Sequence, residues 1–77
     1  MNKKIPAISI HFRTYPPTLT EQVKVSIADM TIGSMAYSVT MKCWYDIDFP
    51  EVSAEDSLDC AFAMWKYRED IHQKEFA

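Results

Sequence analysis

The chain has 77 residues and a net charge of −3 at pH 7, and 48% of its residues are apolar. This length suits one domain over residues 1–77, and the composition is rich enough for a compact core, which argues against intrinsic disorder. No apolar run is long enough to span a bilayer, which excludes a membrane-spanning protein. We therefore expect a cytoplasmic protein that does not bind a membrane.

Two cysteines are too few for a scaffold that is held together by disulfides. Free cysteine is among the most buried residue types, so we expect Cys43 and Cys60 to be reduced side chains of the core. A single bridge between them is the alternative.

The charged residues are distributed unevenly along the chain. Residues 1–42 carry five basic and two acidic side chains, a balance of +3. Residues 43–65 carry six acidic side chains and no lysine or arginine, and residues 66–77 are neutral. The chain is thus divided into a mildly basic first part and an acidic segment.

Residues 34–47 show the strongest secondary-structure signal. From position 35 onward every odd residue is apolar or aromatic and the even residues are mostly small or polar, which is the alternation of a strand with one buried face. This parity places Cys43 and Tyr45 toward the core and Trp44 toward solvent. Similar alternation predicts two earlier strands, at about residues 5–14 and 21–29.

The alternation changes phase between the second and third predicted strands. Met30 and Ile32 fall on the opposite parity to Ile27, and the single glycine of the chain, Gly33, follows them. We interpret this as a turn with a β-bulge that joins the two strands into a hairpin. The pattern leaves open which of these strands the first one pairs with.

A helix is predicted over about residues 54–74, where neither glycine nor proline occurs. Ser53 fits the N-cap position, and Glu55 and Asp56 suit the positive end of a helix. The order β-β-β-α predicts a two-layer α+β domain, in which a C-terminal amphipathic helix covers one face of a three-stranded antiparallel sheet. The broad apolar side that should face the sheet consists of Ala54, Leu58, Cys60, Ala61, Met64, Trp65, Tyr67 and Ile71.

The acidic segment is the leading candidate for a binding surface. Glu55 and Asp59 are like charges four residues apart, which slightly weakens an isolated helix and so suggests a purpose other than stability. Phe62 falls among charged positions of the helical wheel, where an aromatic side chain suits an interface anchor. The competing interpretation is a solvated acidic face that caps the helix, with Phe62 completing the core. The predicted partner-binding residues are Asp46, Asp48, Glu51, Glu55, Asp56, Asp59 and Phe62.

The outward face of the sheet is the alternative candidate, and its ligand would be nucleic acid. Basic and aromatic side chains on an open sheet bind single strands through phosphate charge and base stacking. The set is small, and a pI of about 5.2 is low for a nucleic-acid-binding protein, so a solvated face is the favoured interpretation. The residues of this alternative are Arg13, Lys24, Lys42 and Trp44.

No cofactor, metal site or catalytic motif is expected. The two cysteines and two histidines lack the close paired spacing of zinc ligands, and the acidic residues at 46, 48 and 51 lack the glycine and the ligand number of a calcium loop. A chain with one glycine also has no phosphate-binding glycine loop and no nucleophile elbow. The sequence therefore predicts a protein that is not an enzyme.

Residues 49–61, Phe-Pro-Glu-Val-Ser-Ala-Glu-Asp-Ser-Leu-Asp-Cys-Ala, resemble the strand-to-helix junction of HicB-like antitoxins. The glycine-containing turns of that family are missing, and no site residue is carried over from it. In size and organisation the chain is also similar to the small proteins with which bacteriophages and mobile elements block host machinery, including anti-CRISPR proteins. This second resemblance implies an inhibitory binding protein.

We therefore expect a small inhibitor, encoded by a phage or mobile element, that presents an acidic surface to a larger protein or complex that handles nucleic acid. The first alternative is a nucleic-acid-binding or regulatory module that uses the outward face of the sheet. The second alternative is a structural subunit or an antitoxin-like homodimer that is joined through an exposed strand edge.

Overall fold

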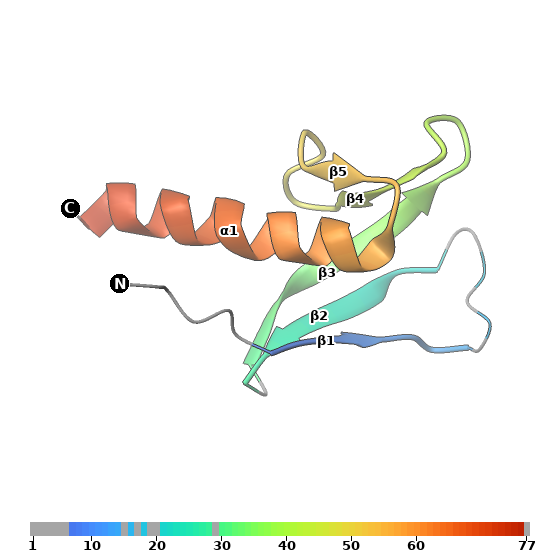
Figure 1. Ribbon diagram of the computed structural model, residues 1–77, viewed down its shortest axis with the longest axis horizontal. Helices are drawn as coiled ribbons and strands as arrows, with labels where there is room; N and C mark the ends of the chain where they lie inside the picture. The colour runs from blue at the N-terminus through green and yellow to red at the C-terminus, as the bar shows by residue number, and fades with distance from the viewer. Residues whose placement is uncertain (1–6, 15, 17, 19–20, 29, 77) are drawn as a thin grey trace.

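The computed structural model describes residues 7–14, 16, 18, 21–28 and 30–76, which form one antiparallel sheet and one helix. The strands lie in the order β1-β2-β3-β4-β5, and each pairs with the next. The predicted α+β class is confirmed, whereas the prediction of three strands is wrong. In chain order the elements are β1 (Ile8–His11), β2 (Val23–Ile27), β3 (Met30–Ser38), β4 (Cys43–Asp46), β5 (Ser53–Ala54) and α1 (Ser57–Phe76) (Figure 1).

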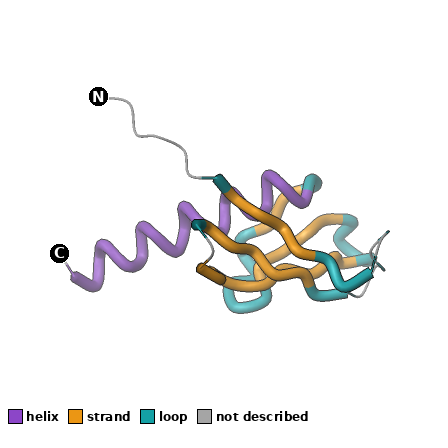
Figure 2. Tube along the Cα trace, turned by 90° about the horizontal axis from the view of Figure 1, so that it is seen from below, coloured by secondary structure: helices purple, strands orange, loops and turns teal. Residues whose placement is uncertain are grey.

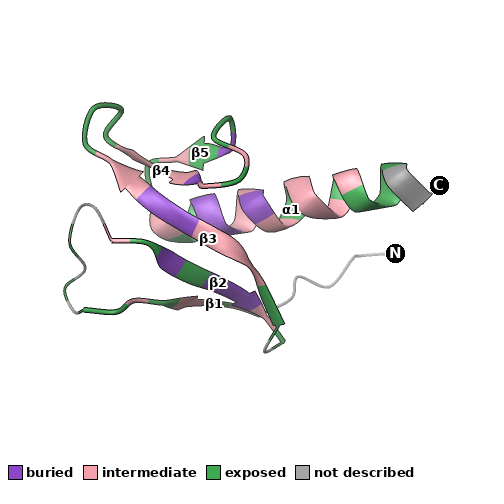
Figure 3. Ribbon diagram, turned by 180° about the vertical axis from the view of Figure 1, so that it is seen from behind, coloured by how far each residue is buried: buried purple, intermediate pink, exposed green. Residues whose placement is uncertain are grey.

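The helix α1 packs on one face of the sheet, and the core lies between the two layers (Figures 1 and 2). The C-terminal end of α1 extends beyond the sheet, and residues 70–74 are mostly exposed (Figures 1 and 2). No helix among the described residues is long and apolar enough to cross a membrane. Figure 3 shows buried segments on β2, β3 and the first half of α1. The buried core residues are Val23, Val25, Met35, Cys60, Ala61 and Met64 of these elements and Val52, which directly precedes β5.

The long strand predicted over residues 34–47 is divided by a turn, so this prediction is wrong. Residues 39–42 connect β3 to β4, and Ser38 Oγ accepts a hydrogen bond from the backbone N–H of Met41 at 3.1 Å. Lys42 has a positive φ of 56°. Val39 and Met41 are exposed there, with 57% and 72% of their surfaces accessible. Their apolar side chains continue the alternation of β3, which is why the sequence pattern does not show the turn.

The turn also reverses which side chains of β4 face the core. Tyr37 pairs with Trp44, and residues directly opposite each other in an antiparallel ladder lie on the same face. Trp44 therefore packs against the core, where its ring centroid lies 5.4 Å from Tyr37 and 6.4 Å from Phe12. Cys43 and Tyr45 alternate with Trp44 and lie on the face that α1 does not cover. The predicted orientation of β4 is thus inverted.

The first two strands are shorter than predicted. β1 covers four residues of the predicted range 5–14, and β2 covers residues 23–27 of the predicted range 21–29. Residues 5, 6 and 29 lie outside the described residues. Phe12 packs against the core although it lies beyond the end of β1, so the apolar alternation continues past the hydrogen-bonded ladder. β1 pairs with β2, which answers the pairing question that the sequence left open.

The predicted bulge is confirmed, but Gly33 does not lie in a turn. The register between β2 and β3 shifts after Val25, so that Ile32 is the extra residue of β3. Gly33 lies within β3, directly opposite Val25. A Cβ atom built on Gly33 would lie 2.8 Å from Nη2 of Arg68 in α1, which is closer than such atoms approach. The close approach of Arg68 therefore explains the glycine at this position.

The helix α1 begins at Ser57, three residues later than predicted, because Ser53 belongs to β5 and pairs with β4. The N-cap is Asp56. Its Oδ1 accepts a hydrogen bond from the backbone N–H of Leu58 at 2.7 Å, and its carbonyl accepts the N–H of Cys60 at 2.9 Å. The prediction that Ser53 caps the helix is therefore wrong, since Ser53 pairs with Tyr45 of β4 in the sheet.

Both cysteine thiols are free, and Cys60 lies in the core as predicted. Burial raises the pKa of the Cys60 thiol from 9.0 to about 11, and the negative charge of Asp46 adds to this shift. The folded state keeps the thiol protonated where the unfolded chain would ionise it. Its contribution to stability is therefore complete below pH 9.0 and is lost as the pH rises through about 11.

The two thiols should differ in reactivity. In the native protein at about pH 8, we expect a disulfide reagent to modify Cys43 quickly and Cys60 only as fast as the protein unfolds. Cys43 is half-buried on the uncovered face of the sheet, whereas Cys60 is fully buried. A Cys43→Ser variant should show no fast reaction. Fast modification of both thiols in the native protein would contradict the placement of Cys60.

Candidate functional site

A buried ion pair between Asp46 and Arg68 removes part of the acidic segment from the surface. The Asp46 side chain has no exposed area, and it accepts hydrogen bonds from Arg68 Nε at 3.1 Å and from Arg68 Nη2 at 2.7 Å. Arg68 Nη2 also donates to Oδ2 of Asp48 at 2.9 Å. We call these three side chains the Arg68 clasp. Asp46 and Asp48 thus join the end of β4 to α1, and Asp46 is not available to a partner.

The clasp fixes how α1 sits on the sheet. The guanidinium group of Arg68 lies over Gly33 of β3 and 5.0 Å from the ring centroid of Phe49. Burial alone would lower the pKa of Arg68, but the hydrogen bonds and charges of Asp46 and Asp48 outweigh burial and raise it. Arg68 therefore stays charged, and its two-point bond with Asp46 sets the rotation of the helix about its axis.

Glu51 of the predicted set also has an internal partner. Its Oε1 accepts a hydrogen bond from the Tyr67 hydroxyl at 3.0 Å, and this bond raises the pKa of Tyr67. The Tyr67 ring contacts Phe49 edge to face, with 5.2 Å between the ring centroids. Glu51 is exposed, so it still adds negative charge to the surface while it anchors the loop before β5 to α1.

The remaining predicted acids surround the start of α1. Glu55, Asp56 and Asp59 are all exposed, and Asp56 is the N-cap residue described above. Their charges also favour the positive end of the helix dipole, so they stabilise the helix without a basic partner. We call Glu55, Asp56 and Asp59 the helix-start acids. The structure thus brings three of the six predicted acids to the surface at one end of α1.

A stripe of apolar side chains runs from one flank of α1 to the side that faces away from the sheet, at roughly 100° to 160° around the helix from the buried Met64. Leu58, Phe62 and Trp65 are spaced four and three residues apart, and among the described residues they belong neither to the core nor to the side chains packed against it. At 3.6 residues per turn, Phe62 lies about 160° around the helix from the buried Met64. Leu58 is 54% exposed, and the rings of Phe62 and Trp65 contact each other edge to face at 5.5 Å. We call Leu58, Phe62 and Trp65 the outer stripe.

The outer stripe corrects the predicted sheet-facing side of the helix. The wheel places Leu58 and Trp65 inward, but the buried side is centred on Cys60, Ala61 and Met64. The short side chains of Cys60 and Ala61 let the helix approach the sheet closely, and the Arg68 clasp holds this rotation. The broad apolar side is therefore only partly buried. Phe62 is half-buried beside Trp65, as suits the predicted anchor.

The residues of the nucleic-acid alternative are not all on one surface. Arg13 and Lys24 are exposed and line the same depression on the face that α1 leaves uncovered. Lys42 lies in the turn between β3 and β4, and Trp44 packs against the core on the opposite face. The aromatic side chain that was meant to stack on bases is thus absent from the uncovered face, and His11 lines the depression instead.

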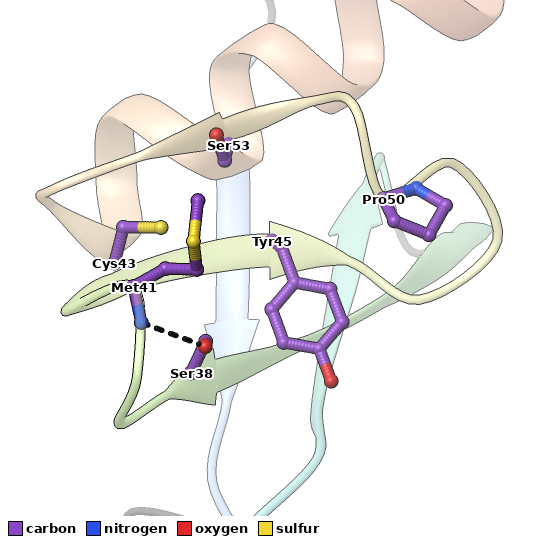
Figure 4. Close-up of a pocket in the computed structure, with 6 residues that line it drawn as sticks. All are labelled: Ser38, Met41, Cys43, Tyr45, Pro50 and Ser53. Carbon is purple, nitrogen blue, oxygen red and sulfur yellow. Dashed lines mark hydrogen bonds between the residues drawn. The ribbon is translucent and has the colours of Figure 1, made fainter.

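A shallow pocket lies on the uncovered face beside the β3–β4 turn (Figure 4). It has a volume of about 270 Å³, and Cys43 and Tyr45 of β4 line it together with the exposed Met41. Cys43 and Met41 give it a soft, apolar wall. Its full lining is Ser38, Met41, Cys43, Tyr45, Pro50 and Ser53. This pocket contains no cluster of groups that could perform acid–base or nucleophilic catalysis together.

Among the residues that the structure describes, no group of three or more His, Cys, Asp or Glu side chains is arranged to hold a metal ion. Asp46 and Asp48, whose spacing partly matches that of calcium-loop ligands, instead bind Arg68.

Comparison of the chain with protein-family models, with curated proteins and with solved structures finds no match in any of the three.

Four side chains that matter here were not among the predicted site residues. Leu58 and Trp65 are part of the outer stripe, and their spacing with Phe62 is a signal for a second apolar face on the helix. His11 lies directly opposite Lys24 across the β1–β2 ladder, which only the strand register reveals. Arg68 is separated from Asp46 by 22 positions, so no local pattern connects them.

Proposed function

We propose that this chain is a small non-enzymatic protein that binds a larger protein through the outer stripe and the helix-start acids. The observation that supports this best is the gathering of Leu58, Phe62 and Trp65 outside the side of α1 that packs on the sheet, with Leu58 exposed and the two aromatic rings half-buried against each other. Clusters of accessible apolar and aromatic side chains are typical of protein–protein interfaces. Helices dock into grooves through anchors at this spacing.

The charge around the stripe defines the chemistry of the partner. Residues 43–65 carry six acidic side chains and no basic one, and the helix-start acids lie beside Leu58 at the surface. The complementary surface is an apolar groove with lysine and arginine along its rim. The acids would speed association by long-range attraction, and burial of Phe62 and Trp65 would slow dissociation.

Lysine and arginine side chains are also the groups with which proteins bind the phosphate backbone of nucleic acid. A small acidic protein that occupies the groove excludes the nucleic acid, so the binding we propose is inhibitory. Asp46 is excluded from the contact residues because it is buried in the Arg68 clasp. Asp48 and Glu51 are exposed and would add to the negative field without losing their internal bonds.

Charge reversal tests the role of the helix-start acids. We expect a Glu55→Lys, Asp59→Lys variant to bind the partner at least about 10-fold more weakly, mainly through slower association, because both changes repel a basic rim. The loss should shrink as salt is added. The measurement is surface plasmon resonance with the captured partner, at two salt concentrations.

Asp70→Lys, compared with the single change Asp59→Lys, is the control that matches the change in net charge. Asp70 is an exposed acid on the same helix, but it lies about three turns after the helix-start acids. Its reversal should change the association rate much less than Asp59→Lys does. Circular dichroism would confirm that these variants stay folded. If the double variant binds the partner with the same affinity as the wild type, the helix-start acids do not contribute to binding.

A further inference from the structure

A row of hydrogen-bond donors crosses the face of the sheet that α1 leaves uncovered. His11 of β1 lies directly opposite Lys24 of β2, and Lys24 lies directly opposite Ser34 of β3. Residues paired in this way share one face of a sheet, and their side chains are close neighbours. Trp44 and the core lie on the other face, so this row is independent of the outer stripe on α1.

The row forms the floor of a depression of about 400 Å³. This volume is within the range of sites that bind small molecules. Arg13 and Gln22, from the two ends of the connection between β1 and β2, line the depression together with Phe12. All the polar side chains of this lining are able to donate a hydrogen bond, and no carboxylate is among them. The lining consists of His11, Phe12, Arg13, Gln22, Lys24 and Ser34.

Within the part of the chain that the structure describes, the two cations of this depression are not paired with a carboxylate. The carboxylates of Asp46 and Asp48 pair with Arg68, and among the described residues neither Arg13 nor Lys24 takes part in an ion pair. The nearby carboxylate of Glu21 accepts a hydrogen bond from Thr14 Oγ1 at 2.9 Å and does not line the depression. Two cations held close together repel each other, and an anion between them removes that cost.

We propose that this depression binds the phosphate group of a phosphate ester. Arg13 and Lys24 supply the positive charge, and His11, Gln22 and Ser34 supply further donors around the anion. The depression has room for more than the phosphate. The ester is either a free nucleotide or one unit of a nucleic-acid strand, and both present the same phosphate chemistry to these residues. This site lies beyond the function proposed above, because it uses no residue of α1.

Nuclear magnetic resonance titration of the full chain tests the site with three probes: inorganic phosphate, adenosine monophosphate and a short single-stranded DNA. We expect saturable shifts of the amides of His11, Lys24 and Ser34 with at least one probe, and weaker binding as salt is added. Shifts with the mononucleotide identify a nucleotide site, whereas shifts with the DNA alone identify a strand site. If the ligand is a DNA strand, the logarithm of the affinity falls as the logarithm of the salt concentration rises. Lys24→Gln removes one phosphate contact and should make this negative slope shallower by roughly 0.7.

Lys24→Glu should reduce the affinity at least about 10-fold, because it places a carboxylate in the centre of the donor row. Lys66→Glu is the matched control, since Lys66 is an exposed lysine on α1 and the variant has the same change in net charge. The affinity of the Lys66→Glu protein for the probe should stay within a factor of about two of the wild-type affinity. The proposal is overturned if no probe causes saturable shifts in the row, or if both variants lose affinity equally. Neither result affects the proposal for the outer stripe. The Lys24→Glu variant should bind the partner of the outer stripe as the wild type does.

Discussion

Replacement of Arg68 with methionine should lower the free energy of unfolding by about 3–5 kcal/mol. Methionine keeps much of the aliphatic stem, but it leaves the fully buried carboxylate of Asp46 without its two charged hydrogen bonds. An uncompensated buried charge is far more costly than the loss of an exposed ion pair. Since small domains are stable by about 5–15 kcal/mol, the variant should be close to unfolding. Urea denaturation followed by tryptophan fluorescence measures the change.

Two further variants separate the clasp from general damage to α1. Lys66→Met changes an exposed lysine two positions away, and its effect should stay within about 0.5 kcal/mol. The double variant Asp46→Asn, Arg68→Met leaves no buried charge, so it should be more stable than Arg68→Met alone. If Arg68→Met is no less stable than Lys66→Met, the clasp does not hold the helix to the sheet.

Truncation of Phe62 should have the largest effect on partner binding. We expect Phe62→Ala to weaken the complex by at least about 2 kcal/mol, or roughly 30-fold, because an aromatic anchor at the centre of an interface loses its whole contact area. The loss should appear mainly in the dissociation rate. Stability should change little, since Phe62 does not pack against the core. Surface plasmon resonance and urea denaturation of the same preparation measure the two effects.

Tyr45→Ala is the matched control for Phe62. Tyr45 is also a half-buried aromatic residue outside the core, but it lies on the uncovered face of the sheet. Its truncation should leave the dissociation rate of the partner unchanged. If Tyr45→Ala and Phe62→Ala have equal effects, the interface is not on α1.

The fold class was predictable from the sequence, because β-strands and a long helix without glycine or proline leave strong periodic signals. The division of residues 34–47 into two strands was not. Val39 and Met41 are apolar but exposed in the turn, so the alternation continues across a point where the chain reverses. The inward position of Trp44 follows from the length of that turn, and periodicity carries no information about it.

The candidate site was predictable only in part. The exposure of Glu55 and Asp59 and the position of Phe62 outside the core follow from charge and helical phase. The burial of Asp46 depends on Arg68, which comes from a different element, and the acidic composition of the segment does not reveal such a partner. The same contact explains Gly33, which the sequence alone suggests as a turn residue. Contacts between distant positions of the chain therefore set the limit of what the sequence could show.

The most direct test of the α1 surface is a comparative capture experiment from a nuclease-treated bacterial lysate. Three tagged baits are compared by quantitative mass spectrometry: the wild type, a Phe62→Ala, Trp65→Ala variant and Lys24→Glu. Binding through the outer stripe predicts a protein that the wild type and Lys24→Glu retain and that the double variant loses. Retention of the same proteins in equal amounts by all three baits would contradict binding through the outer stripe.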